Sequence, residues 1–436
     1  MSLASDHLTA FEYQPLPVSQ PAARGGITPA EADVLTAIDA RRRGFCDRGY
    51  RSVRLAQFCG LVSLGGRMLE ILPKVDEGDS ADECRGILLR MLRISGEFPL
   101  VRHRQAAHHL RHCPLLEIFI AAFLDAVADL IRGGMLRMYQ DEEEDLGVVR
   151  GTVHLARQLG VNMNRPDRVA CRFDELTADN PWNQILKAGL RAVRPWIKRG
   201  DLARRWVELR ANFEDVEDVP CGVREIDRLV FDRQAVRYRE AITWVRSILL
   251  VLSPDLRAGS SDAPGLLFDM ERIFEAAVTT TVRRRGARGG FEILAQSADT
   301  FMAKVGGAPG QQEFRLRPDL LVREQGRVTA IVDVKWKRVE VSSSGFLIPA
   351  SSDVYQMHAY GTRFGCHELA LVYPHHPAQG RARSTVYELP SVAGGHPRLS
   401  VVCLDLADDA LPAAIAGEST VLRRLFGSAF ADNAPS

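Results

Sequence analysis

The chain has 436 residues, of which 46% are hydrophobic and 25% are charged, and 56 Lys plus Arg against 55 Asp plus Glu give a formal net charge of +1. This balance is typical of a globular protein of about two to four domains, and it excludes a disordered tail, a collagen-like fibre and a disulfide-rich secreted module. Because the total charge is close to zero, any binding to nucleic acid must use local basic patches.

Positive charge comes almost entirely from Arg, because only six residues are Lys, and two of these, Lys335 and Lys337, lie almost side by side. The eight cysteines include no pair at CxxC spacing, so we expect scattered thiols in a reducing cytoplasm. The N-terminus has no signal-peptide pattern. The longest apolar stretch, 115–131, contains three acidic residues, so we expect a buried helix there and no membrane segment.

Residues 1–83 are expected to form a β-rich domain. The stretch 62–72 predicts a hairpin, because Gly65-Gly66 at its centre suits a two-residue turn with positive φ. Other strand candidates lie at 11–13 and 50–55.

Residues 84–255 are expected to form a mainly helical middle domain, interrupted by a short β-like piece at 147–155. A run rich in Ser, Pro, Gly and Asp at 253–265 is the best linker candidate. Helical periodicity covers residues 85–94, 115–132, 181–199 and 226–252.

Residues 266–406 are expected to form an α/β domain, followed by a C-terminal helix and tail at 407–436. A helix is predicted at 353–364, with Asp353 as N-cap and Gly365 just beyond its end. The chain as a whole is therefore expected to be a multidomain α+β protein. The other elements predicted in this domain are a helix at 266–285 and strands at 291–295, 314–322, 328–336, 368–373 and 399–404.

The most informative stretch of the sequence is RLRPDLLVREQGRVTAIVDVKWKR at 315–338. Glu324-Gln325-Gly326-Arg327 predicts a turn, so that Asp319 begins one strand of a hairpin and Asp333 and Lys335 lie on one face of the other. Two carboxylates and an ammonium group at one point are what Mg²⁺-dependent hydrolysis of a phosphodiester requires. A lone Asp333 in an apolar strand is also costly to bury without a partner.

Two helices flank this hairpin in the sequence. Glu271 and Glu275 share a helix face before it, and either one is a candidate third carboxylate, with a solvated face as the alternative. Gln356 and Tyr360 share a face after it, where both can contact a phosphate or hold the lysine, although Tyr360 alone also fits a core position.

In this order and spacing, the motifs Glu, Pro-Asp, Asp-x-Lys and Gln-x-x-x-Tyr resemble the PD-(D/E)xK nuclease superfamily, and the last element resembles its RecB-like branch. The sequence resembles more closely still the McrC family, the nuclease subunits of McrBC modification-dependent restriction systems. The resemblance covers most of the chain and also includes EILPK at 70–74, Arg150-Gly151, ADNPWNQILK at 178–187 and FDMERIFE at 268–275.

The resemblance implies a restriction-endonuclease-like C-terminal domain in which Asp319 and Asp333 ligate Mg²⁺, with Mn²⁺ as a substitute. It implies that Lys335 is the catalytic lysine, that Glu275 is the helix glutamate and that Gln356 belongs to the site. It also implies an McrB-like AAA+ GTPase hexamer as partner, methylated double-stranded DNA as substrate, and an N-terminal finger that enters the ring and stimulates GTP hydrolysis. The sequence contains no GxxxxGK[ST] motif, so we expect this chain to bind no nucleotide.

Two arginine-bearing segments are further candidates. Arg283, Arg284 and Arg285 are placed to grip DNA phosphates beside the site, with a solvated helix end as the alternative. Arg67 flanks the tip of the 62–72 hairpin, which is either the finger or an ordinary hairpin of the sheet; the segment 147–155 is the next candidate for the finger. The histidines at 103, 108, 109 and 112 are expected to be structural or exposed.

Two other functions stay open on sequence grounds. One is a non-catalytic adaptor that activates an AAA+ GTPase and carries a degenerate nuclease domain; the intact Asp319, Asp333, Lys335, Glu275 and Gln356 argue against it. The other is a stand-alone RecB-like nuclease, against which the large N-terminal part argues, because nuclease chemistry does not require it.

Overall fold

The computed structural model describes residues 7–74, 78, 80–97, 112–252, 265–296, 300–304, 312–375, 384–390, 395–415 and 419–427. The chain divides into two compact units, Met1–Leu115 with Leu267–Ser436 and Leu116–Leu266. It mixes helices and sheets, as the predicted α+β class requires. The predicted linker lies outside the described residues except for Gly265.

The N-terminal part of the first unit contains two small sheets, in the orders β1-β6-β5-β10 and β2-β4-β3. The predicted hairpin forms as β5 and β6, with Gly65 at φ 91° in the turn between them. Helix α1 (Pro29–Arg41) begins with a capping box between Thr28 and Glu31. The strands are β1 (His7–Phe11), β2 (Pro15–Pro17), β3 (Cys46–Arg48), β4 (Ser52–Leu55), β5 (Phe58–Ser63), β6 (Met68–Leu72) and β10 (Gly265–Asp269).

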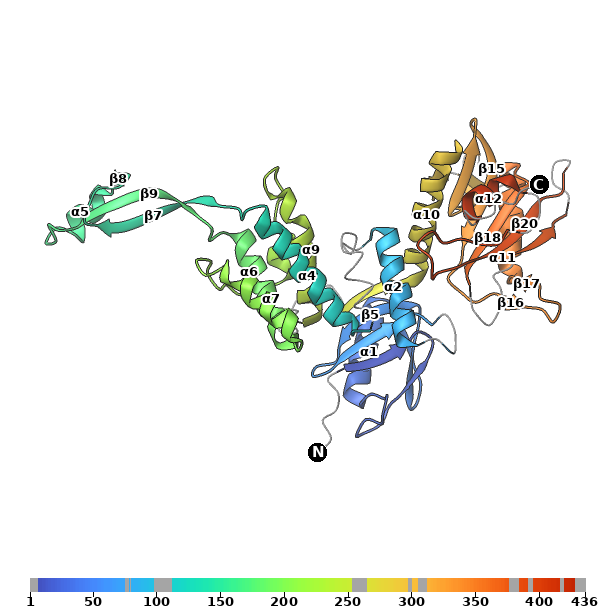
Figure 1. Ribbon diagram of the computed structural model, residues 1–436, viewed down its shortest axis with the longest axis horizontal. Helices are drawn as coiled ribbons and strands as arrows, with labels where there is room; N and C mark the ends of the chain where they lie inside the picture. Colours follow the sequence, from blue (N-terminus) through green and yellow to red (C-terminus); the bar gives the residue numbers. More distant parts are fainter. Residues whose placement is uncertain are drawn as a thin grey trace. The chain divides into compact units, whose positions relative to one another are not determined.

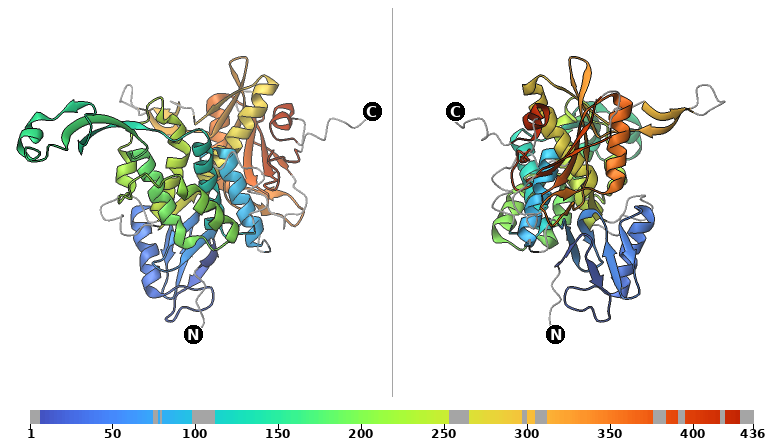
Figure 2. Two further views of the ribbon diagram at one scale, coloured as in Figure 1. Left: turned by 60° about the vertical axis from the view of Figure 1, so that its left-hand side comes forward. Right: turned by 90° about the vertical axis from the view of Figure 1, so that its right-hand side faces the viewer.

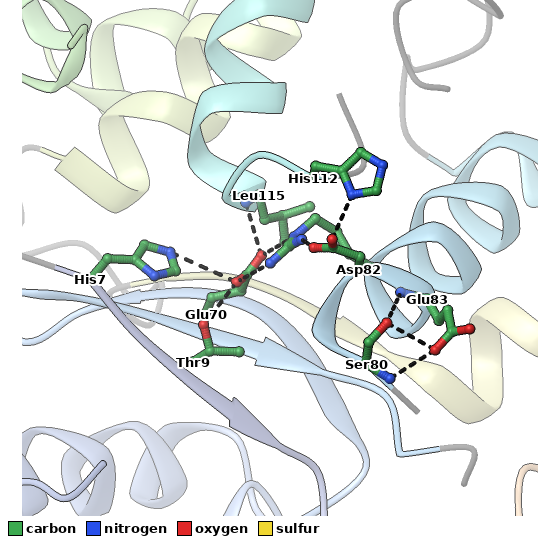
Figure 3. Close-up of polar contacts among 9 residues, drawn as sticks. His7, Thr9, Glu70, Ser80, Asp82, Glu83, His112 and Leu115 are labelled. Atoms are coloured by element: carbon green, nitrogen blue, oxygen red, sulfur yellow. Dashed lines mark hydrogen bonds and ion pairs between the residues drawn. The ribbon is translucent and has the colours of Figure 1, made fainter. Parts of the chain in front are cut away.

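A buried ion pair links these sheets to the helices that follow. Glu70 on β6 is fully buried, and its carboxylate accepts hydrogen bonds from both Nε and a terminal nitrogen of Arg85, at 2.7 and 2.9 Å. It also accepts the hydroxyl of Thr9 and the backbone N–H of Leu115 (Figure 3). Arg85 lies on α2 (Ala81–Ser95). The hydrogen bonds of Glu70 therefore join β6 to β1, to α2 and to Leu115.

The sequence placed α2 in the middle domain, but it belongs to the first unit, where it packs against α10 (Met270–Gly289). The predicted helix at 266–285 also begins later than expected. The carboxylate of Asp269 accepts the backbone N–H groups of Glu271 and Arg272 and so caps α10. The apolar residues before Asp269 form strand β10 instead.

The C-terminal part of the first unit is built on a six-stranded sheet in the order β11-β14-β15-β18-β20-β19. β15, β18 and β20 run parallel, and the other neighbours are antiparallel. Helix α11 covers one face and α10 with α12 covers the other (Figure 2). The elements are β11 (Glu292–Ala295), β14 (Leu320–Glu324), β15 (Arg327–Val334), α11 (Ser351–Phe364), β18 (Glu368–Pro374), β19 (Thr385–Glu388), β20 (Arg398–Leu404) and α12 (Thr420–Phe426).

Three details of this domain differ from the sequence prediction. The predicted strand 314–322 is split into β13 and β14, so that Asp319 lies directly before β14. Asp353 is not the N-cap of α11; it lies inside the first turn and is buried. Four short strands were not predicted: β12 (Thr300–Lys304), β16 (Glu340–Val341), β17 (Leu347–Ile348) and β19, whereas β13 (Gln312–Leu316) covers the first part of the predicted strand. Gly365 ends the helix at φ 61°, as predicted.

The second unit is a helical body whose core is aromatic. Trp182, Tyr238 and Trp244 are buried there, with Tyr238 packed edge-on against Trp182. Its helices are α4 (Leu115–Arg132, of which Leu115 belongs to the first unit), α6 (Pro181–Val193), η1 (Arg194–Trp196), α7 (Gly200–Ala211), α8 (Val223–Asp227), η2 (Ala235–Tyr238) and α9 (Arg239–Leu252).

A long hairpin arm projects from this helical body (Figure 1). β7 (Met138–Leu146) and β9 (Val169–Thr177) pair over their whole length, and β8 (Thr152–Val153) and α5 (Leu155–Gly160) lie near the far end. The sequence predicted only a short β-like piece here, so the prediction of a mainly helical middle region missed this arm. In the part of the chain that the structure describes, no helix combines the length and apolar character of a membrane span.

Candidate active site

The structure brings Asp319 and Asp333 together at one end of β15. The predicted turn forms at Gln325-Gly326, both with positive φ, and sets β14 antiparallel to β15. Oδ2 of Asp319 accepts the backbone N–H of Val334, the residue after Asp333, at 2.7 Å. The hairpin register and this hydrogen bond therefore hold the two carboxylates side by side.

Both carboxylates are destabilised in their charged form. Burial raises the pKa of Asp319 to about 7, with the negative charge of Asp333 adding to the effect. Burial likewise raises the pKa of Asp333, which is only 1% exposed, although Lys335 opposes the shift. A pair of buried, mutually repelling carboxylates binds a cation favourably, because the cation relieves both the repulsion and the desolvation.

Lys335 extends along the same face as Asp333. Its ammonium group lies 2.6 Å from Oδ2 of Asp333, and its backbone N–H donates to the carbonyl of Val372 on β18. Burial lowers the pKa of Lys335, but the charges of Asp333 and Asp319 outweigh this and leave its pKa above the usual value. Lys335 is therefore a fixed positive charge at the edge of the carboxylate pair.

The donor set suits a hard divalent cation. Mg²⁺ typically takes one or two protein carboxylates and completes its shell with water and substrate phosphate oxygens, which is what Asp319 and Asp333 offer. Oδ2 of Asp333 is buried and faces the ammonium group of Lys335 at 2.6 Å. Among the described residues there is no cluster of three His, Cys, Asp or Glu side chains that would form an all-protein metal site.

Glu275 rather than Glu271 is the helix glutamate that lies near the pair. The charge of Glu275 contributes to the raised pKa of both Asp319 and Asp333, whereas no such effect comes from the exposed Glu271. Gln296 holds Glu275 in place: its side-chain amide donates to Glu275 at 2.8 Å, and its backbone N–H donates to the carbonyl of Asp319. Sequence reasoning missed Gln296.

Gln356 and Tyr360 lie on α11, and the Gln356 amide donates to the Tyr360 hydroxyl at 2.8 Å. Tyr360 is only 2% exposed, so its ring is a core residue and only its hydroxyl is placed to act in the site. Burial raises its pKa, and the charges of Asp333 and Asp319 act in the same direction, which puts the hydroxyl in the field of the carboxylate pair.

The family of this chain follows from its sequence as a whole. The family described as "McrBC 5-methylcytosine restriction system component" matches residues 53–374, more than half of the chain. The chain belongs to this family. No curated protein matches it.

Solved structures of McrBC complexes have the same fold. A chain from the assembly of Thermococcus gammatolerans McrB AAA+ hexamers with bound McrC matches with a TM-score of 0.68 at 17% identity, over 96% of this chain and 98% of that one. A chain of the Thermococcus gammatolerans McrBC complex matches with a TM-score of 0.51 at 18% identity, over 64% of this chain and 88% of that one.

Two of the segments on which the resemblance to the McrC family rests shape the arm. Gly151 has φ 68°, and a Cβ there would lie 2.3 Å from the carbonyl oxygen of Arg172 and 2.7 Å from Cβ of Phe173. Arg150 lies over the Phe173 ring, 4.0 Å from its centroid. Arg150-Gly151 therefore closes the end of the arm onto β9, which only glycine permits at the second position.

The motif at 178–187 locks the base of the same arm. The Asn183 side-chain amide donates to the carbonyls of Leu136, before β7, and Ala178, after β9, while its oxygen accepts the Tyr238 hydroxyl. Asn180 caps α6 and also donates to Leu136. The motif is thus structural in this McrBC-family chain, and its hydrogen bonds fix where β7 begins and where β9 ends.

Arg285 and Arg67 are held by structural contacts, whereas DNA contact by Arg283 and Arg284 stays a prediction. Arg285 donates to the carbonyls of Leu425 and Ala410, so it holds the C-terminal segment, whereas Arg283 and Arg284 are exposed. Arg67 makes two hydrogen bonds to Glu31, at 2.8 and 2.6 Å, in a hairpin whose strands are almost entirely buried.

The 62–72 hairpin therefore fits the second of its two alternatives, an ordinary hairpin of the sheet, better than the finger. The histidine cluster lies largely outside the described residues. Its last member, His112, is paired with Asp82.

Proposed function

We propose that this chain is an McrC-like endonuclease subunit that hydrolyses phosphodiester bonds of double-stranded DNA in the presence of Mg²⁺. The observation that carries the proposal is the buried pair of Asp319 and Asp333, at the end of one strand, with the Lys335 ammonium group 2.6 Å from one of its oxygens. This arrangement, in which two buried carboxylates repel each other beside one lysine, lowers the stability of the fold. It is useful when a metal and a phosphate complete the site.

Asp319 and Asp333 would hold the metal through their carboxylate oxygens. Bound there, Mg²⁺ or Mn²⁺ would supply a Lewis acid that generates hydroxide and offsets the charge developing on the phosphate. Lys335 orients the attacking water through its ammonium hydrogens and is fixed by its contact with Asp333. Glu275, anchored by Gln296, accepts a hydrogen bond at the edge of the site, and Gln356 with Tyr360 offers polar groups to a DNA phosphate.

We propose further that the partner is an McrB-like AAA+ GTPase hexamer and that the β7–β9 arm is the finger that engages it. Near the far end of the arm the structure exposes an unusual concentration of apolar side chains, which marks an interaction surface. Those at least 58% exposed are Val148, Val149, Leu155, Leu159, Val161 and Met163. The nucleotide is bound by the partner, and stimulation of GTP hydrolysis depends on the arm.

Cleavage tests the nuclease proposal directly. The chain is mixed with its partner, GTP and methylated or unmethylated plasmid, with Asp333→Ala as matched control. We expect cutting of the methylated plasmid in Mg²⁺ or Mn²⁺ and none in Ca²⁺, which prefers looser coordination. Robust cutting in EDTA would exclude the metal mechanism. Stimulated GTP hydrolysis with no cutting under any condition would instead favour the non-catalytic adaptor.

Two glycine variants test the arm. Gly151→Ala forces a Cβ into the backbone of β9, whereas Gly160→Ala, also on the arm, meets nothing within 4 Å. We expect Gly151→Ala to lose stimulation of the partner GTPase and to gain hydrogen exchange in the arm, with the melting of the first unit unchanged. Gly160→Ala should behave as wild type. Full stimulation by Gly151→Ala, with a disordered arm, would place the finger elsewhere.

A further inference from the structure

A third buried carboxylate lies beside the proposed active site and has no role in it so far. Asp353, in the first turn of α11, is only 5% exposed. Its Oδ2 accepts the hydroxyl of Tyr373 on β18 at 2.8 Å and lies 2.7 Å from the ammonium group of Lys337. Asp353 is therefore held from two directions, by a strand of the sheet and by the chain that leaves β15.

Lys337 is the second lysine after Asp333; it lies beyond the end of β15 at Val334, and its ammonium group meets Asp353. Trp336, between the two lysines, donates its indole N–H to Glu12 and packs edge-on against Phe274 of α10. Two ammonium groups thus reach toward one cluster of carboxylates, and each takes a different partner: Lys335 takes Asp333 and Lys337 takes Asp353.

The charge of Asp353 also acts on the proposed catalytic residues. Together with the larger effect of burial, it helps to raise the pKa of Asp333, and it favours the charged form of Lys335. Its carboxylate is thus close enough to matter electrostatically. If Asp353 were neutral, Lys337 would lose its ion-pair partner at 2.7 Å, and an ammonium group that turned toward Asp333 would oppose a divalent cation there.

We propose that Asp353 is a positioning residue that holds Lys337 away from Asp333, so that Asp333 serves Lys335 and the metal alone. This inference rests on the proposed nuclease function. It gives the ion pair between Lys337 and Asp353 a function. It also explains why a buried aspartate lies one turn before Gln356, on the face of α11 that packs against the sheet. Asp353 acts through Lys337 and does not itself touch the metal.

The test compares four variants of the full-length chain by Mn²⁺ binding, followed by calorimetry, and by the Mg²⁺ dependence of cleavage with the partner. Asp353→Asn frees Lys337 and should weaken Mn²⁺ binding about tenfold, or about 1.4 kcal/mol. Lys337→Met should bind Mn²⁺ at least as tightly as wild type. The double variant Asp353→Asn with Lys337→Met should recover to within about threefold of wild type, because the competing ammonium group is gone. Tyr373→Phe, which removes only the other partner of Asp353, is the matched control and should leave affinity unchanged.

Each outcome decides between this inference and its alternatives. If the double variant binds Mn²⁺ as weakly as Asp353→Asn, the aspartate acts by holding α11 and the inference is wrong. If Asp333→Asn weakens binding but Asp353→Asn does not, the inference alone is overturned. If binding is insensitive to Asp333→Asn as well, the proposed metal site fails and the role of Asp353 fails with it. Melting curves of all variants exclude unfolding as the cause.

Discussion

Two buried carboxylates in the first unit, Glu70 and Asp333, each meet one cation, and they differ in what else surrounds them. Glu70 accepts four hydrogen bonds, two of them from Arg85 (Figure 3). Asp333 has a lysine at one oxygen and a second carboxylate, Asp319, for a neighbour, and burial raises its pKa. A fully bonded carboxylate in the interior holds elements together, whereas one left under-bonded beside a like charge is free to bind a ligand.

The difference is not visible in the sequence motifs. Glu70 lies in EILPK at 70–74, a segment on which the resemblance to the McrC family rests just as it rests on the motifs around Asp319 and Asp333. In the structure, that glutamate joins β6, α2 and the start of α4. The bonding of each carboxylate, rather than its presence in a motif, separates the structural role from the catalytic one.

The largest expected effect is on DNA cleavage, when Lys335 beside Asp333 is replaced. Lys335→Ala should reduce cleavage at least about 100-fold, because the attacking water loses its orienting group. Lys335→Arg should fail similarly, since a planar guanidinium group cannot replace a compact ammonium group. Rates are measured with the partner present under Mg²⁺, and GTPase stimulation serves as control. Wild-type cutting by Lys335→Arg would show that Lys335 is not the catalytic lysine.

The second effect is on stability, at the fully bonded site. Glu70→Ala leaves Arg85 buried without its main partner and should cost about 3–5 kcal/mol of unfolding free energy. Replacing both, as Glu70→Leu with Arg85→Met, should recover much of this loss, because no charge is then left buried. Denaturant unfolding measures both variants. If Glu70→Ala lowers the unfolding free energy no more than an average surface substitution does, the contrast drawn between Glu70 and Asp333 is wrong.

The third effect is on stability as a function of pH. Here the loss of a carboxylate should stabilise the protein, whereas the loss of Glu70 should destabilise it. The pKa of Asp319 is about 7 in the fold against 3.8 ordinarily, so between these values the folded state binds more protons than the unfolded state. The contribution of Asp319 to stability should therefore fall as the pH rises from about 4 to 7. Asp319→Asn removes this penalty and should be more stable than wild type at pH 8, by about 2–4 kcal/mol, with no advantage near pH 4.

Metal supplies the control for this prediction. Adding Mg²⁺ at pH 8 should stabilise the wild type, because the ion binds only the folded site, and should leave Asp319→Asn unchanged. Thermal unfolding at pH 4 and pH 8, with and without Mg²⁺, measures all four combinations. A variant less stable than wild type at pH 8 would mean that Asp319 is a structural carboxylate of the same kind as Glu70.

The hairpin that carries the candidate active site was predictable because its signal is local. Asp319, the turn at Gln325-Gly326 and Asp333 lie within one stretch, and the alternation of a strand fixes which side chains share a face. Lys335 stood out because lysine is scarce in this chain. The structure brings these residues together as the pattern predicted, and their chemical roles remain proposals.

The β7–β9 arm and the pairing of Asp353 with Lys337 could not be predicted from the sequence, and the reasons are physical. β7 carries the acidic run 141–145, which has low strand propensity and no apolar alternation, and it is held instead by cross-strand pairs such as Arg172 with Asp141. Strand β10 is a short apolar run, which periodicity alone cannot distinguish from a helix. The pairing of Lys337 with Asp353 joins residues that only the folded chain brings together.

The smallest expected effect extends the comparison to two neighbouring arginines on α10. Arg285 is bonded to two carbonyls, so Arg285→Ala should cost about 1–3 kcal/mol of stability, by leaving those acceptors unpaired. Arg283 is exposed and makes no ion pair with a described residue, so Arg283→Ala should leave stability unchanged. If it contacts DNA, binding should weaken about threefold at low salt, and the slope of log K against log salt should fall by about 0.9. DNA titrations at several salt concentrations measure this, and an unchanged slope would leave Arg283 as a solvated helix-end residue.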